Sequence, residues 1–261
     1  MSPSTLRTWE RRLGYPKPRR TDGNHRLFEL AEIEALREAL RETNNISSAV
    51  EVAQRRGRGP SSPSRLLAAF DRFDERGADR ELEESLAVRT LERTLEEILL
   101  PALDSAAARA NGEAELEYAC RWATGWLHSA RRLAPPASRP QGVLLLDSGP
   151  ALTTEAVHVQ ALELSLRRAG LRVLLLSADL AERRYSTALR ALDPDAVVIC
   201  GAEARLDVLG EPLRRAMRSA GASPFSYRSA HLVGGRDGIP SLGSRPGEAT
   251  ARLLADTGLS I

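Results

Sequence analysis

The chain has little of several residue types, and each shortage excludes a class of protein. Only two cysteines, Cys120 and Cys200, occur in 261 residues. They lie far apart and show no CxxC or Cys/His spacing, so we expect buried free thiols and neither a disulfide framework nor a zinc site. No apolar run approaches the roughly eighteen residues that cross a bilayer, and no signal-peptide region is present. We therefore expect a globular cytoplasmic protein with no membrane partner.

Motifs for catalysis and for nucleotide binding are also missing. No Ser/His/Asp group, paired carboxylate motif or metal cluster stands at a useful spacing, so we expect no catalytic residue, no metal and no enzyme activity. The loop that begins at Asp147 reads Asp-Ser-Gly-Pro. Its single glycine makes neither a GxGxxG motif nor a P-loop, which excludes the common nucleotide sites.

Basic charge is concentrated at the start of the chain. Residues 1–26 hold seven basic and two acidic side chains, which gives +5 in a chain whose total is only +2, so the other 235 residues are mildly acidic. After Pro3, the residues Leu6, Trp9 and Leu13 recur at helical spacing, and Gly14 ends the pattern. The sequence therefore predicts a short amphipathic helix with a basic outer face.

A two-stranded wing is predicted directly after this helix. Pro16, Pro18 and the turn at residues 21–24 break the periodicity, with basic residues on both sides. Arginine on an outward helix face suits the major groove, because a guanidinium group binds phosphates or guanine edges in a bidentate way. Basic side chains of a wing suit phosphate contact. The residues expected to contact DNA are Ser4, Arg7, Thr8, Arg11 and Arg12 of the helix and Lys17, Arg19, Arg20, His25 and Arg26 of the wing. Taken alone, an arginine-rich helix is usually a solvated basic surface.

Two stretches rich in glycine, proline and serine, residues 55–64 and 134–142, divide the chain into three expected domains. In residues 1–57 the helix and wing are followed by helices near residues 30–40 and 47–54. Residues 64–133 have helical periodicity throughout and predict a four-helix bundle. In residues 141–261, apolar runs at 143–146, 172–176 and 196–199 alternate with helical segments at 155–168, 181–192 and 205–220. This alternation predicts a doubly wound α/β domain, with less certain strands near residues 231–235 and 241.

The segment from Ser2 to Phe28 resembles the recognition helix and wing of MerR-type winged-helix regulators, almost residue by residue. The resemblance implies that Leu6 and Trp9 are core, that Arg7 and Arg11 face DNA, and that the pairs Arg19-Arg20 and His25-Arg26 flank the wing turn. Asn24 departs from the glycine that is usual in that turn. Family members carry a first helix ahead of this point, so we expect a truncated winged helix. We hypothesise that Met1 is a misassigned start.

The order of a MerR-type head, a helical bundle and a doubly wound domain resembles the cobalamin-dependent light-sensing regulators that repress carotenoid genes. In that family a Glu-x-His-x-x-Gly motif supplies the lower ligand of cobalt, and a Trp and a Glu-His pair cover the upper face. The matching positions here are degenerate: they hold Thr153, Glu155 and His158 for the first motif and Arg109, Ala119 and Cys120 for the second.

None of the family's ligand groups is kept in place, and a hard carboxylate is a poor substitute for imidazole, so we expect that the chain uses no cobalamin. His158 or His128 could replace the ligand, although lone histidines on ordinary helices are more often core or surface residues. Trp122 and Trp126, at i and i+4, are more typical of bundle core than of a cofactor site.

The sequence therefore predicts a sequence-specific transcriptional regulator that binds repeated operator sites in double-stranded DNA as a dimer or tetramer. Its C-terminal domains would serve oligomerisation or sensing, with the pocket between them either collapsed or filled by an unknown small molecule. One alternative is a partner or antagonist of a related regulator that does not itself bind DNA. The other is a corrinoid-binding photoreceptor or corrinoid enzyme, against which Glu155 argues.

Overall fold

The computed structural model divides the chain into two compact units, Met1–Ser62 and Pro63–Ile261. It describes residues 3–16, 18–20, 26–28, 33, 36–37, 39–40, 43, 45–55, 61–109, 111–178, 182–201, 211–228 and 239–256. Each unit is described by itself below. The domain ranges 1–57, 64–133 and 141–261 stay a prediction. Among the helices that can be described, none is long and apolar enough to span a membrane.

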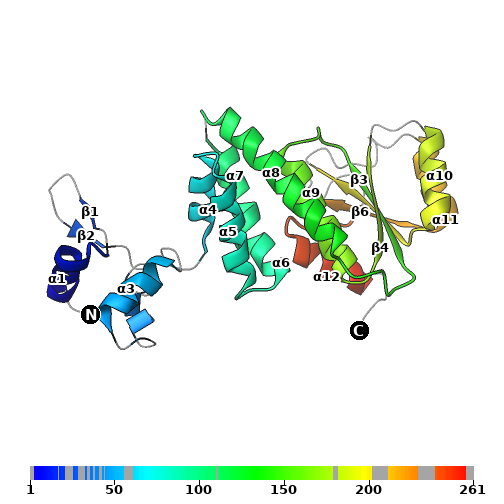
Figure 1. Ribbon diagram of the computed structural model, residues 1–261. Coiled ribbons are helices and arrows are strands. Elements are labelled where there is room, and N and C mark those ends of the chain that lie inside the picture. The colour runs from blue at the N-terminus through cyan, green and yellow to red at the C-terminus, as the bar shows by residue number, and fades with distance from the viewer. Residues whose placement is uncertain are drawn as a thin grey trace. The chain divides into compact units, whose positions relative to one another are not determined.

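The first unit begins with the helix α1 (Pro3–Leu13) and the two short strands β1 (Arg19–Arg20) and β2 (Arg26–Leu27) (Figure 1). The strands pair antiparallel, with Arg20 opposite Arg26, which confirms the expected two-stranded wing. Gly14 ends α1 as predicted: its φ is +67°, a left-handed conformation that glycine adopts without strain, and its N–H donates to the Glu10 carbonyl at 2.9 Å.

A small core supports this unit. Leu6 is buried, and Tyr15 lies in a cluster with Leu36, Ala39, Ala49 and Val50, against which Trp9 and Leu13 are partly buried. The helix α3 (Ile46–Arg55) supplies Ala49 and Val50. The apolar face of α1 thus points inward at the predicted positions, which leaves its other face for solvent or a partner.

The second unit opens with helices that pack around a common core: α4 (Pro63–Phe70), α5 (Glu75–Leu86), the continuous run α6 (Leu91–Thr94), η1 (Leu95–Leu99) and α7 (Leu100–Ala107), and α8 (Glu113–Arg132). The four helical rods lie where the apolar periodicity predicts them. The sequence does not predict the π-helical turn η1, which widens the third rod. Trp122 and Trp126 are partly buried against this core, as expected for bundle residues.

A parallel sheet follows the bundle. Its strands are β3 (Gly142–Asp147), β4 (Arg172–Ser177), β5 (Ala196–Cys200) and β6 (Ser223–Tyr227), in the order β4-β3-β5-β6. The helices α9 (Thr154–Arg168) and α12 (Pro246–Asp256) share a core with one face of the sheet. The helices α10 (Glu182–Leu192) and α11 (Glu211–Ala220) cover the other face (Figure 1). The doubly wound α/β prediction is therefore confirmed.

The edge of this sheet differs in detail from the expectation. The fourth strand, β6, precedes residues 231–235, where a strand was expected, and residues 229–238 lie outside the described part. Phe225 and Tyr227 alternate into the core of this otherwise polar segment, which is why the short strand carries little apolar signal. The strand expected near Ser241 is reduced to one parallel bridge between Ser241 and Ser226.

The helix α9 belongs to both the bundle and the sheet. Val157, Ala161 and Leu164 join the bundle core, whereas Val159 and Leu162 join the core of the sheet. A helix that is buried on both sides loses the usual polar stripe, and α9 accordingly buries ten of its fifteen residues. The bundle and the α/β layers therefore form one body around this helix.

Candidate nucleic-acid interface and interlayer site

The outward face of α1 carries the predicted DNA-contacting side chains. Ser4, Arg7, Thr8, Arg11 and Arg12 are exposed, at the spacings that bring residues i, i+3, i+4 and i+7 to one side of a helix. The Thr8 hydroxyl donates to the Ser4 carbonyl at 3.0 Å, which turns that side chain back onto the helix. Two arginines one turn apart, Arg7 and Arg11, thus stand on the face opposite the buried Leu6.

The wing places three further predicted residues on paired strands. Arg19 pairs across the ladder with Leu27, and Arg20 with Arg26. The side-chain directions of these arginines lie outside what the structure describes, as do Lys17 and His25 altogether. The described geometry is therefore a short helix with an exposed basic face followed by a hairpin with arginine on both strands.

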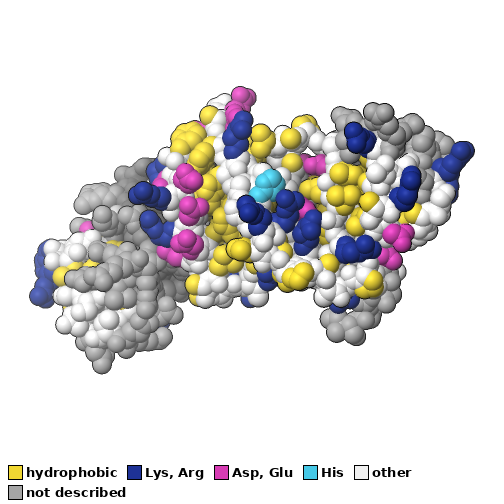
Figure 2. Space-filling model, turned by 45° about the vertical axis from the view of Figure 1, so that its right-hand side comes forward, with side chains coloured by type: hydrophobic (Ala, Val, Ile, Leu, Met, Phe, Trp, Pro, Cys, Tyr) yellow, Lys and Arg dark blue, Asp and Glu magenta, His cyan; other side chains and the backbone are white. Residues whose placement is uncertain are grey.

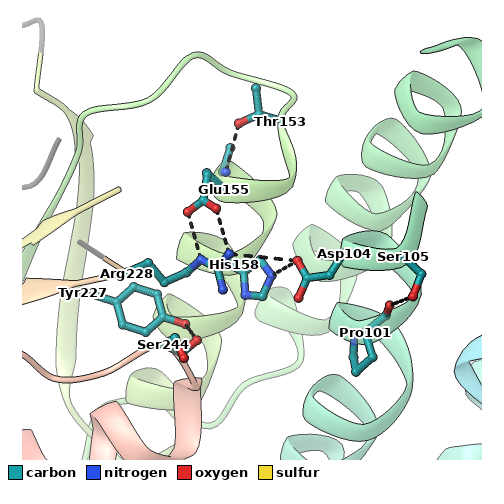
Figure 3. Close-up of polar contacts among 10 residues, drawn as sticks. Pro101, Asp104, Ser105, Thr153, Glu155, His158, Tyr227, Arg228 and Ser244 are labelled. Carbon is teal, nitrogen blue, oxygen red and sulfur yellow. Dashed lines mark hydrogen bonds and ion pairs between the residues drawn. The ribbon is translucent and has the colours of Figure 1, made fainter. Parts of the chain in front are cut away.

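A second candidate site lies where the bundle meets the carboxyl ends of the strands (Figure 3). Thr153 is the N-cap of α9, and its hydroxyl accepts the Ala156 N–H at 3.2 Å. Glu155, in the first turn, accepts two hydrogen bonds from Arg228, at 2.9 Å from Nε and 2.7 Å from Nη2. Arg228 follows β6 with a φ of +55°, a conformation that costs energy in a residue with a Cβ. Glu155 is thus held by a bidentate ion pair.

His158 is buried one turn further along α9, and its side chain is only 3% exposed. Its Nε2 lies 2.9 Å from Oδ1 of Asp104 on α7, and its Nδ1 has no hydrogen-bond partner among the described residues. Burial raises the pKa of the Asp104 carboxyl, but the hydrogen bond and electrostatic attraction of His158, together with the charge of Arg228, outweigh it, so that this pKa lies below its usual value. His158 therefore ties the α/β layer to the bundle.

Arg228 connects the two pairs. Its Nη2 lies 4.0 Å from the same Asp104 oxygen that contacts His158, so four polar side chains form a continuous cluster across the interface. We call Glu155, Arg228, Asp104 and His158 the interlayer cluster. Burial lowers the pKa of the Arg228 guanidinium, but the hydrogen bonds and charge of Glu155, together with the charge of Asp104 and the nearby Tyr227, outweigh it and the pKa is raised.

A polar cavity of about 370 Å³ lies beside the interlayer cluster. Its walls include Asp104 and Ser105 of α7, His158 and Arg228, and the start of α12 at Pro246. At its edge, Glu96 of η1 accepts the Gly247 N–H at 2.6 Å. The π-helical turn thus supplies a carboxylate that caps α12, which is favourable at the positive end of a helix.

The other positions that the family resemblance predicts to be degenerate, Arg109, Ala119 and Cys120, lie on α8 and in the segment before it. Arg109 forms an ion pair with Asp71. Ala119 and Cys120 are buried in the bundle core. Burial raises the pKa of the Cys120 thiol to about 11, so this cysteine remains a neutral thiol at physiological pH. Within the described ranges, no three His, Cys, Asp or Glu side chains gather into a group that could hold a metal ion.

A side-chain hydrogen bond crosses the point where doubly wound sheets usually bind ligands. In this sheet the direction of winding reverses between β3 and β5, and ligands of such folds bind outside the carboxyl ends of the strands at that point. Here the hydroxyl of Ser148, directly after β3, donates to the Cys200 carbonyl at the end of β5, at 2.7 Å. A side-chain bridge therefore spans the switch point.

Asp104 and Arg228 are the members of the interlayer cluster that sequence reasoning missed. Asp104 lies 54 positions before its partner His158, and Arg228 lies 73 positions after its partner Glu155. Neither belongs to a local motif. The one available signal was indirect: the buried α9 carries Glu155 and His158, and buried charged groups need partners.

Comparison with known proteins places these features in context. Residues 1–46 match the family model described as "MerR HTH family regulatory protein". Over 270 residues the chain is 27% identical to the HTH-type transcriptional repressor CarA of Myxococcus xanthus, covering 97% of this chain and 90% of CarA. The HTH-type transcriptional repressor CarH of the same organism is 29% identical over 226 residues, covering 74% of this chain and 72% of CarH.

A solved structure bears on the fold of the second unit. The monomethylamine corrinoid protein of Methanosarcina barkeri superimposes with a TM-score of 0.55 at 11% identity, over 73% of this chain and 96% of that protein. At this identity the likeness shows the fold alone. The chain is thus a transcriptional regulator of the MerR helix-turn-helix type, homologous over most of its length to the repressors CarA and CarH and built on a corrinoid-protein-like α/β fold.

Proposed function

We propose that the chain acts in the cytoplasm as a sequence-specific regulator that binds operator DNA through α1 and the β1–β2 wing, carries out no reaction, and works without cobalamin. The observation that carries this proposal is the exposed basic face of α1, which stands on a small core of its own and precedes a hairpin with arginine on both strands. We call α1 and the wing the head; it lies within residues 1–46, which match the MerR HTH family model, and CarA, to which 97% of the chain aligns, is an HTH-type repressor.

The two parts of the head suit different contacts. Arg7 and Arg11 are one helical turn apart on an exposed face, so both can reach the edges of neighbouring bases when α1 lies in the major groove. The arginines of the wing are suited to phosphates, which position the protein without reading sequence. Operator preference therefore resides in α1, and the dependence of binding on salt is shared with the wing.

Independence from cobalamin is supported by the interlayer cluster. An axial ligand needs an imidazole nitrogen that is free to reach cobalt, and its position is occupied by Glu155, whose carboxylate is bound by Arg228 at 2.7 and 2.9 Å. The neighbouring His158 directs Nε2 at Asp104. The side chains present do not suit a corrinoid with cobalt ligated from below, because the carboxylate at the ligand position is engaged by Arg228 and the Nε2 of His158 by Asp104, which leaves only the buried Nδ1 of His158 without a partner among the described residues.

The second unit then serves assembly or the sensing of another small molecule. Repeated half-sites are read by symmetric oligomers, and we expect a dimer or a tetramer on inverted or direct repeats. The polar cavity beside His158 has room for a small ligand other than a corrinoid.

The test is a DNA-binding titration of the full chain on its gene's upstream region, with and without adenosylcobalamin. We expect binding that weakens steeply with salt and does not respond to adenosylcobalamin. Arg7→Ala or Arg11→Ala should weaken operator binding by about 1–3 kcal/mol, which is the usual value for a contact to a base edge. The matched control is Arg215→Ala, an exposed arginine on α11.

Two results would contradict the proposal. A purified protein that bound adenosylcobalamin and absorbed visible light would overturn its cofactor independence. Equal binding of the operator and of an unrelated duplex, unchanged by Arg7→Ala, would overturn sequence-specific recognition by α1.

A further inference from the structure

Six arginines lie together where α8 and α9 end: Arg131, Arg132, Arg139, Arg167, Arg168 and Arg172. Shared or neighbouring partners bring several of them together, and Arg132 follows Arg131 in the last turn of α8. Arg131 and Arg167 both bind Oε1 of Glu163, at 3.2 and 2.8 Å. Arg139 donates to the carbonyl of Ala169, and Arg172 donates to the carbonyl of Pro140. We call this group the arginine ridge. Figure 2 shows dark blue side chains gathered beside a histidine on the face that α8 and α9 form.

The ridge carries a positive charge in a part of the chain that is mildly acidic as a whole. Two carboxylates of the described residues pair with it: Glu163, which is 3% exposed beneath two guanidinium groups, and Glu92, which pairs with Arg168 at 2.6 Å. Six cations against two anions leave a formal charge of +4, whereas residues 27–261 as a whole are mildly acidic. Charge of one sign is thus concentrated on one surface rather than spread over the unit.

The guanidinium groups are also held in position. The Nε of Arg168 donates to the Glu92 carboxylate, and the Nε of Arg172 donates to the Pro140 carbonyl at 2.7 Å. No contact is recorded for their terminal nitrogens within the described residues. Arg132 is exposed, one turn beyond the exposed His128 on the same side of α8. A guanidinium group fixed at one edge presents its remaining donors in a rigid fork, which suits phosphate oxygens.

A local explanation accounts for part of this pattern. Arg131 and Arg132 lie in the last turn of α8, and Arg167 and Arg168 in the last turn of α9, where cations favourably face the negative ends of the helices. It does not account for Arg139 and Arg172, which lie outside both helices and extend the same surface. The helix ends explain why four cations are tolerated, and the two additional arginines indicate a surface that suits an anionic partner.

We propose that the arginine ridge is a second DNA-contacting surface, which binds backbone phosphates of the duplex beside the segment bound by the head. The choice of partner rests on the proposed DNA-binding function. Phosphate contacts of this kind add affinity and salt dependence without sequence preference, so the ridge would lengthen the footprint and leave operator choice to α1.

The experiment compares two double variants of the full chain. Each replaces two arginines by neutral glutamines, so the two variants have the same net charge. Arg132→Gln with Arg172→Gln removes two ridge cations and breaks no ion pair recorded in the structure. Arg190→Gln with Arg215→Gln removes two exposed cations from α10 and α11, on the opposite face of the sheet. Binding to a long unrelated duplex and to the operator is measured by fluorescence anisotropy between 50 and 200 mM salt.

For the ridge variant, the slope of log binding constant against log salt should become shallower by about 1.8, because each lost phosphate contact removes about 0.9. Between 50 and 200 mM salt, the binding constant of the ridge variant should therefore fall by a factor about 12-fold smaller than that of the wild type. The preference for operator over unrelated duplex should be unchanged. The control variant should keep the wild-type slope, and sedimentation should give both variants the mass of the wild-type assembly.

Other outcomes overturn the proposal. If operator binding depends on Arg7 while the ridge variant keeps the full salt slope, the head binds DNA as proposed and only the ridge is refuted. If the ridge variant loses assembly mass, the surface belongs to contacts between copies of the chain. A full chain that binds no duplex refutes both the ridge and the proposed function.

Discussion

The ion pair between Glu155 and Arg228 offers the sharpest test of the interlayer site. We expect a double-mutant cycle built from Glu155→Ala, Arg228→Ala and the double variant to show a coupling free energy of about 1–2 kcal/mol in unfolding. The coupling arises because two charge-assisted hydrogen bonds, at 2.7 and 2.9 Å, are lost together when either partner is truncated.

Exposure sets the size of this coupling. The side chains of Arg228 and Glu155 are 19% and 35% exposed, so the pair is neither a fully buried one, whose disruption costs about 3–5 kcal/mol, nor a surface pair worth about 0–1 kcal/mol. The matched control is the ion pair of Glu117 and Arg121 on α8, at 2.7 Å with both side chains 60% exposed. Its coupling should stay below about 0.5 kcal/mol.

Urea unfolding of the full chain, followed by tryptophan fluorescence, gives the four free energies of each cycle. Trp122 and Trp126 of the bundle are partly buried and report on the unit that contains the ion pair. A coupling for Glu155 and Arg228 no larger than that of the control would refute the reasoning. It would mean that the carboxylate at the ligand position is not held by Arg228, and the main support for cobalamin independence would be lost.

Three further predictions follow from the same region. Arg228→Gly should be less destabilising than Arg228→Ala, by about 1 kcal/mol in urea unfolding, because glycine adopts the φ of +55° without strain. Thr153→Ala should destabilise the chain by about 1 kcal/mol in the same assay, through loss of the cap on the Ala156 N–H. Burial raises the pKa of Asp147, so stability falls as pH rises from the unfolded pKa near 3.8 through the raised folded pKa. The free energy of unfolding of Asp147→Asn, taken relative to that of the wild type, should therefore increase as the pH rises from 3 to 7, and a difference that does not change with pH would contradict this.

The elements that could be predicted from the sequence are those with a strong local pattern. Leu6, Trp9 and Gly14 define α1, and the continuous apolar runs define β3, β4 and β5, because periodicity and breakers act over a few residues. The strand β6 was harder to predict, since a short edge strand with Phe225 and Tyr227 as its alternating apolar residues resembles a polar loop.

The site residues also divide into those with a local pattern in the sequence and those that are brought together only by the fold. The exposed positions on α1 follow from helical spacing, whereas the assignment of Glu155 to the position of the cobalt ligand is a prediction that rests on the family resemblance. The identity of its partner could not be predicted, because Arg228 comes to Glu155 only when the sheet and α9 have folded, and tertiary pairing over 73 residues leaves no local signature. His158 illustrates the same limit: its burial follows from α9 being shared by two cores.

The shared position of α9 has a consequence for how this unit comes apart. Since the helix supplies Val157 and Leu164 to the bundle and Leu162 to the sheet, neither half can be released without exposing apolar surface on the other. We expect the bundle and the sheet to melt in a single cooperative transition. Separate polypeptides cut between residues 134 and 141 should aggregate unless they are produced together. A signal received in the cavity would then be transmitted by movement of the whole body rather than by hinging between its two halves.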